Sequence, residues 1–297
     1  MLSSSDAKQI KLSRKDNGCI TKKLKNMEEI IVGIDFSKGS ECAIELAIDM
    51  ANKMRKNIKL VYVVSPSGVE MSIEKTESKI NDLITKYADK LIGGNFKYEV
   101  VKGKVSEKLS LIAKEEKASY VVVGTHGTSG YEKDWIGRNA YKTIEETECP
   151  VLTIRENFNF NKDLENIVVP IDSSMETRQK MPYVVKIAKL FKSTVRILGL
   201  YTSESIITVV DKYIEQVEKY LTNFDIPYTV EKTACENITT ATLEYADSIN
   251  ADLIVIMTEQ EKKLSNIMLG SYAQQMIHRS MVPVLTIHPD EINSAAR

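Results

Sequence analysis

The chain has little of what marks secreted, membrane-spanning or metal-binding proteins. Among its 297 residues the four cysteines, Cys19, Cys42, Cys149 and Cys235, are scattered and form neither a CxxC pair nor a zinc-ligand spacing. Four such thiols in a chain of this length are typical of a reduced, cytosolic protein. No apolar run approaches the length of a membrane span, so no membrane partner is expected.

An excess of charge of one sign is also absent. Lys and Arg number 40 against 41 Asp and Glu, so no overall attraction to nucleic acid is expected. Of the three histidines, His278 and His288 lie apart with no carboxylate or thiol at ligand spacing, and no metal site is predicted. A P-loop pattern is missing, and neither Ser37 nor Ser173 lies in a G-x-S-x-G context. No catalytic residue is therefore assigned.

The N-terminal segment differs from the rest of the chain. Residues 1–26 carry seven Lys or Arg against Asp6 and Asp16, with few apolar residues and no apolar core of a secretory signal. Two interpretations stay open: residues 1–27 form a disordered basic tail, or translation starts at Met27, just before the first predicted strand. A nucleic-acid-binding arm is not favoured, because no aromatic residues are interleaved with the basic ones.

What the chain does have is an internal repeat. Residues 28–155 and residues 165–289 each open with a buried-type strand that ends in aspartate and close with Pro-Val-Leu-Thr-Ile. The two aspartates, Asp35 and Asp172, lie 137 positions apart, whereas the closing motifs lie 133 apart. One duplicated unit with a four-residue difference inside it accounts for both offsets. We predict two domains with these boundaries, each long enough to build its own core.

Each copy alternates short β-branched runs with helical stripes, the pattern of parallel strands joined by crossover helices. Strands are predicted at 30–35, 58–64, 96–101, 119–124 and 151–155, and again at 167–171, 194–200, 228–232, 252–257 and 284–288. Helices are predicted around 43–54 and 80–91, over 105–117 and from Gly137, and then near 176–191, 206–222, 237–249 and 271–280. The aperiodic stretch 156–165 predicts a linker. The expected fold class is α/β: two tandem doubly wound domains, each with a five-stranded parallel sheet.

One glycine motif predicts chemistry. Gly124 ends a predicted strand, Gly127 follows, and after nine further residues Gly137 opens a helix. Glycine lets the backbone approach a ligand closely, and the N–H groups at a helix start favour an anion. Ligands of open α/β sheets bind outside the carboxyl ends of the strands. The motif therefore suits a polyphosphate, with Asp35 placed to meet a base or ribose.

With these residues the sequence resembles the universal stress protein family, specifically its tandem two-domain members, over 28–155 and 165–289. The family motif is G-x-x-G, nine residues, then Gly followed by Ser or Thr. Combined with an aspartate ending the first strand and a closing Pro-Val-Leu strand, it is fairly specific. The resemblance implies an adenine nucleotide alpha hydrolase-like fold and, in some members but not in others, binding of an adenine nucleotide such as ATP.

The resemblance also implies which residues make contact. Adenine and ribose contacts would fall on Gly33, Asp35, Val63 and Val123, and phosphate contacts on Gly124, Gly127, Gly137, Arg138 and Asn139. Arg138 stands where the family has Ser or Thr, and its guanidinium can either pair with phosphate or fill the site. In the second copy residues 257–260 read Met-Thr-Glu-Gln in place of the glycine loop, although Gly270-Ser271 is intact. No nucleotide is expected there.

By the same resemblance the two closing strands would pair across a pseudo-twofold axis, so that one chain mimics a dimer. The main hypothesis is a cytoplasmic stress-response protein, not an enzyme, that binds ATP or a related nucleotide in its N-terminal domain as a regulatory ligand. The alternative is a nucleotide-free protein-interaction module. Besides the nucleotide, a protein partner or self-association through the terminal strands is expected. An ATP-hydrolysing or adenylating enzyme finds little support in the sequence.

Overall fold

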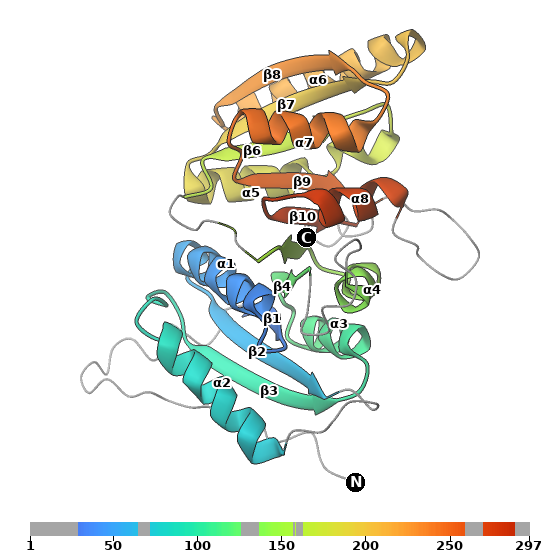
Figure 1. Cartoon of the computed structure of the whole chain (residues 1–297). Helices are drawn as coiled ribbons and strands as arrows, with labels where there is room; N and C mark the ends of the chain where they lie inside the picture. Colours follow the sequence, from blue (N-terminus) through green and yellow to red (C-terminus); the bar gives the residue numbers. More distant parts are fainter. Residues whose placement is uncertain are drawn as a thin grey trace.

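The computed structural model describes residues 29–64, 72–125, 137–156, 158, 163–258 and 270–288. Over these ranges the strands form a single ten-stranded sheet in the order β3-β2-β1-β4-β5-β10-β9-β6-β7-β8 (Figure 1). The first copy supplies β1 (Glu29–Ile34), β2 (Asn57–Val64), β3 (Phe96–Lys102), β4 (Tyr120–Gly124) and β5 (Val151–Ile154). The second supplies β6 (Asn166–Ile171), β7 (Thr194–Tyr201), β8 (Tyr228–Ala234), β9 (Leu253–Met257) and β10 (Val284–Ile287). Each copy thus contributes five parallel strands, as predicted.

Helices connect the strands and cover both faces of the sheet. The first copy has α1 (Lys38–Met54), α2 (Ile73–Tyr87), α3 (Val105–Glu115) and α4 (Arg138–Glu146). The second has α5 (Met181–Phe191), α6 (Ile207–Asn223), α7 (Ile238–Ser248) and α8 (Ser271–Arg279), with short 3-10 helices η1 (Met175–Arg178) and η2 (Glu204–Ile206). Side chains of α1, α2, α5 and α6 pack in one apolar cluster, and those of α3, α4, α7 and α8 pack in the other. The α/β layer arrangement is confirmed.

Strand residues alternate between these two clusters. In β1, Ile30 and Val32 face the α1 and α2 layer, whereas Ile31 between them faces the α3 and α4 layer. All three side chains are fully buried. Burial on both faces explains why these strands are apolar along their whole length instead of alternating with polar residues.

The two copies meet at β5 and β10, which pair antiparallel. Leu152 pairs with Leu285, its own counterpart 133 positions later, so the pseudo-twofold axis passes through this pair. The hydroxyl of Thr286 donates to the Val151 carbonyl at 3.0 Å, and that of Thr153 donates to the Val284 carbonyl at 3.3 Å. The predicted pairing of the closing strands is confirmed.

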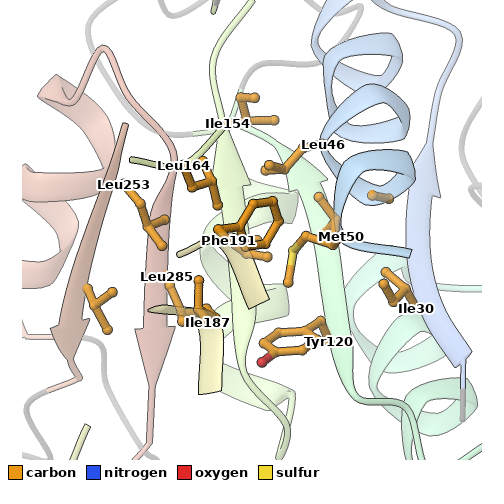
Figure 2. Packing of buried hydrophobic residues seen from close by; sticks show 14 of the residues in the cluster. Ile30, Leu46, Met50, Tyr120, Ile154, Leu164, Ile187, Phe191, Leu253 and Leu285 are labelled. Carbon is orange, nitrogen blue, oxygen red and sulfur yellow. The ribbon is translucent and has the colours of Figure 1, made fainter. Parts of the chain in front are cut away.

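The apolar core continues across this seam. Figure 2 shows Phe191 and Ile187 of α5 among Met50 of α1, Tyr120 of β4 and Leu285 of β10. All five side chains are at least 95% buried and belong to one cluster. Removing one copy would expose this apolar surface, so we expect the two copies to fold as one unit.

One predicted helix begins differently. A single helix over 176–191 is wrong: η1 ends at Arg178 and α5 begins at Met181. Pro182 lies in the first turn of α5. Because proline lacks an N–H and is tolerated only in the first turn, a helix that began at 176 could not run through it.

None of the helices in the described ranges is both long enough and apolar enough to cross a membrane.

Candidate functional site

The candidate site lies where β1 and β4 separate. Their registered pairing runs from Ile30 with Tyr120 to Val32 with Val122, and ends before either strand does. In the sheet β1 lies between β2 and β4. The strand that follows β1 along the chain, β2, lies on one side of it, and β4 lies on the other side, so the strand order reverses here and this is the switch point of the first copy. In open α/β sheets such a point forms a crevice at the carboxyl ends of the strands.

The residues predicted to contact adenine and ribose lie at the ends of neighbouring strands. A Cβ built on Gly33 would lie 3.0 Å from Leu109 Cδ1 and 3.2 Å from Val123 Cγ1. Val63 of β2 packs against the same apolar cluster as Val123. Asp35 follows directly after β1. The fold therefore brings all four predicted positions to neighbouring strand ends.

Local hydrogen bonds fix the turn after β1. The Ser37 N–H donates to Asp35 Oδ1 at 3.0 Å, and Ser37 Oγ caps α1 by accepting from the Ser40 N–H at 3.2 Å. Phe36 between them has a φ of 64°, a left-handed conformation that is uncommon for a residue other than glycine. Its ring lies 5.0 Å from that of Tyr62. The Asp35 carboxylate thus already shapes the loop that would face a ligand.

Gly124 is required by a close approach of two backbone segments. A Cβ at this position would lie 2.7 Å from the carbonyl carbon and 2.9 Å from the oxygen of Gly39, in the first turn of α1. Contacts this short do not occur for real Cβ atoms, so no other residue fits without moving α1. The backbones of α1 and β4 are therefore in direct contact at this level.

Gly124 and Gly137 come together. The Gly137 N–H donates to the carbonyl of Thr125 at 2.8 Å, so Gly137 lies beside the end of β4. Gly137 is the N-cap of α4 and offers no side chain to its first turn. Arg138 and Asn139, the first two helical residues, are exposed, so Arg138 fills no buried pocket. The first N–H groups of a helix have no partner within it, and here they start beside the strand ends.

The remaining predicted contact, Gly127, lies outside the described residues, as do Glu259 and Gln260 of the second copy.

The switch point of the second copy is filled by side chains. Met257, 7% exposed, stands where the first copy has Gly124. Lys180 is buried, and its Nζ donates to the Pro170 carbonyl at 2.6 Å, Pro170 being the counterpart of Gly33. Burial lowers the pKa of Lys180 to about 8, although the charge of Asp172 opposes that shift. A lysine head group and a methionine side chain thus lie at the switch point of the second copy, where the first copy has Ala43 and Gly124.

Two residues at the switch points, Gly39 of the first copy and Lys180 of the second, were not predicted from the sequence. A position-by-position alignment of the two copies contains the signal for both. Lys180 stands at the position of Ala43, just before the apolar face of α5, and Glu176 stands at the position of Gly39. A charge that replaces alanine on a buried helix face needs a buried partner.

With the fold and the crevice in view, the comparisons with known proteins decide the family. The model of the universal stress protein family matches residues 27–155 and again residues 164–288. The chain belongs to the universal stress protein family. It carries the universal stress protein domain twice, and its ten-stranded sheet joins the two domains edge to edge.

Two relatives and one solved structure illustrate the similarity. A universal stress protein of Methanocaldococcus jannaschii is 25% identical over 140 residues, 43% of this chain and 82% of the relative. One of Mycobacterium tuberculosis is 26% identical over 180 residues, 57% of this chain and 63% of the relative, so less than two thirds of that relative is matched. The crystal structure of a universal stress protein of Archaeoglobus fulgidus superposes with a TM-score of 0.71 at 18% identity, over 88% of this chain and 98% of the other. The last similarity concerns the fold alone.

Proposed function

We propose that this universal stress protein binds one molecule of ATP, or a related adenine nucleotide, in its first domain as a regulatory ligand that is not rapidly turned over. The observation that carries the proposal is the bare backbone that comes together at the first switch point. Gly124 lies against Gly39 there, and Gly137 opens a helix beside them. A polyphosphate needs such close access to N–H groups and the positive end of a helix dipole.

The second domain is proposed not to bind nucleotide. Met257 and Lys180 occupy its switch point, as described above. The protein would act in the cytoplasm during a stress response, with no nucleic acid or membrane as partner, and the nucleotide would change which proteins it meets. We propose a binding role for this site, not a catalytic one.

Calorimetric titration with ATP tests the proposal. We expect one site per chain in the wild type. Arg138→Glu places a negative charge in the first turn of α4, and because Arg138 is exposed the variant should fold; we expect it to weaken ATP binding at least tenfold. Ser271→Glu places a negative charge at the corresponding position of α8, a change of one charge unit where Arg138→Glu makes two, and should leave the affinity unchanged.

Three results would contradict the proposal. Two equivalent sites per chain would show that the second domain binds as well. An equal loss in both variants would point to a general electrostatic effect. No heat with ATP, ADP or AMP would favour the alternative, a module that recognises a protein partner without nucleotide.

A further inference from the structure

His288 links the two domains at the seam. It follows β10 of the second domain and is 6% exposed. Its Nε2 lies 2.5 Å from the carbonyl oxygen of Ile144, in the last turn of α4 in the first domain, and its Nδ1 lies 2.7 Å from Thr258 Oγ1. Because a carbonyl oxygen only accepts, Nε2 carries a hydrogen, and in the neutral ring Nδ1 accepts from the Thr258 hydroxyl. One imidazole thus joins the end of β9 to α4.

The contact falls on a helix end that needs outside partners. The last carbonyl groups of a helix have no donors within it. In α4 the Glu146 carbonyl accepts from Ser110 Oγ of α3, at 2.5 Å, within the same domain. The Ile144 carbonyl accepts from His288 of the other domain. One turn from the start of α4, Tyr141 Oη lies 3.4 Å from Gln274 Nε2 of α8.

This link breaks the pseudo-twofold symmetry. The counterpart of His288 in the first domain, 133 positions earlier, is Arg155. The Arg155 guanidinium is directed at Met281 Sδ, 3.9 Å away, and Met281 is 66% exposed. The second domain therefore inserts a buried donor into the first, whereas the matching contact of Arg155 lies at the surface.

We propose that His288 is a positioning residue, through which the second domain fixes α4 and so the first-turn N–H groups beside Gly137. This inference rests on the proposed function, because α4 is the helix that would receive the phosphates. With nine residues α4 is too short to be stable by itself, so its place depends on contacts with its neighbours. The second domain, whose own crevice is filled, would then act as a support for the first.

Three variants separate positioning from general stability. His288→Phe keeps a ring but removes both hydrogen bonds, and His288→Gln keeps an N–H donor for Ile144. Thr286→Val removes a buried seam hydrogen bond to Val151 that does not involve α4. For each variant we would measure unfolding by denaturant, the ATP dissociation constant by calorimetry, and hydrogen–deuterium exchange of the α4 amides without ligand.

The expected pattern distinguishes the three variants. His288→Phe should speed exchange in α4 and weaken ATP binding about five- to tenfold, which corresponds to the loss of one hydrogen bond to a buried group. His288→Gln should restore most of both properties. Thr286→Val should lower the denaturation midpoint while exchange in α4 and ATP affinity stay those of the wild type.

The inference is overturned if His288→Phe changes neither exchange in α4 nor ATP affinity, if it changes exchange alone, or if Thr286→Val changes both as much. Failure of the proposed function gives a separate result. A wild type that binds no ATP would refute nucleotide binding, while the exchange of ligand-free His288→Phe would still show whether His288 holds α4 in place.

Discussion

The two domains share every strand and crossover but differ at the carboxyl end of the first strand. In the first domain α1 begins at Lys38, and its Gly39 backbone lies against Gly124. In the second, Met257 takes the place of Gly124, the 3-10 helix η1 replaces the first helical turn, and Lys180 donates to the carbonyl of Pro170. The same fold therefore has bare backbone at the switch point of one domain and side chains at that of the other.

The difference teaches that site and scaffold are specified by separate residues. Core-facing strand positions stay apolar in both copies, for example Val32 and Val169, each fully buried. The packing of those positions holds the helices on the sheet, and it does not depend on which residues stand at the switch point. A few substitutions at the strand ends can then remove a site without disturbing the rest, and variants of matched residues in the two domains can test this view.

The largest difference in stability between matched variants is expected near the N-terminal ends of the strands, away from the switch points. Lys59 is buried and forms ion pairs with Glu116 and with Glu29, whose side chain is 4% exposed. Its counterpart Arg196 donates instead to the neutral Asn166, at 2.9 Å. Lys59→Met leaves Glu116 without this cation, while the buried Glu29 keeps its ion pair with Lys97. The substitution should cost about 2–3 kcal/mol of unfolding free energy, against about 1 kcal/mol for Arg196→Met.

Chemical denaturation at pH 7 measures both costs. Burial alone lowers the pKa of Lys59, but the hydrogen bond to Glu116 and the charges of Glu29, Glu116 and Glu99 outweigh it and raise the pKa above the ordinary 10.5. A raised lysine pKa stabilises the fold fully below 10.5, and the contribution is lost only as the pH rises through the folded value. Adding Glu116→Gln to Lys59→Met should recover part of the loss. Equal costs for Lys59→Met and Arg196→Met would contradict this account.

A smaller contrast concerns two glycines of the same crevice. Gly124→Ala brings a Cβ to 2.7 Å from a backbone carbon of α1, which cannot move alone, and should cost about 2 kcal/mol. Gly33→Ala meets only side-chain atoms of Leu109 and Val123, at 3.0 and 3.2 Å, and these can shift. We expect a cost below about 1 kcal/mol there. Urea denaturation measures the unfolding free energy of both variants. If Gly124→Ala is as stable as Gly33→Ala, α1 can move to admit the new Cβ at little cost.

Most of the architecture could be predicted from the sequence. The spacing of apolar residues predicts each strand and helix from its own segment, and the internal repeat predicts two similar domains. The alternation of apolar runs and stripes located all ten strands, and the shared Pro-Val-Leu-Thr-Ile motif led through family resemblance to the β5–β10 pairing. Pro182 also carried a local signal, the start of α5, that the helical stripe around it obscured.

The contacts of the site could not be predicted in the same way. The need for glycine at 124 arises from Gly39, 85 positions earlier, and only the packing of α1 on β4 brings the two together. His288 gives no sign in the sequence that its partner is Ile144, in the other domain. Such contacts depend on which elements face each other after folding, and no spacing along the chain encodes them.

Lys180 tests how the second domain fills its crevice. A lysine whose folded pKa lies near 8, below the ordinary 10.5, destabilises the fold when charged, and stability rises as the pH increases from about 8 to 10.5. Lys180→Met should therefore raise the unfolding free energy at pH 7, by about 1–2 kcal/mol after loss of the hydrogen bond to Pro170. The gain should shrink toward pH 10.5. A gain that is constant with pH would mean that charge is not its cause.

The smallest contrast lies at the seam, between Asp49 of α1 and its counterpart Lys186 of α5. Lys186 Nζ lies 5.9 Å from the ring centre of Tyr120 in the other domain. Asp49 has its pKa raised to about 6, by burial first and then by the charges of Asp163 and Glu45. A carboxyl group with a raised pKa favours the fold below its ordinary value of 3.8, and this contribution is lost as the pH rises through 6.

Asp49→Asn should accordingly stabilise the protein above pH 6 and leave it unchanged near pH 4. The shift corresponds to about 3 kcal/mol in full, and because the side chain is partly exposed to water we expect about 1 kcal/mol. Thermal unfolding of both proteins between pH 4 and pH 8 measures the difference. Asp163→Asn, which removes the charge that acts most strongly on Asp49, should reproduce part of the gain at pH 8. If Asp49→Asn stabilises the protein as much at pH 4 as at pH 8, the effect comes from packing. In that case the charge of Asp49 does not destabilise the fold.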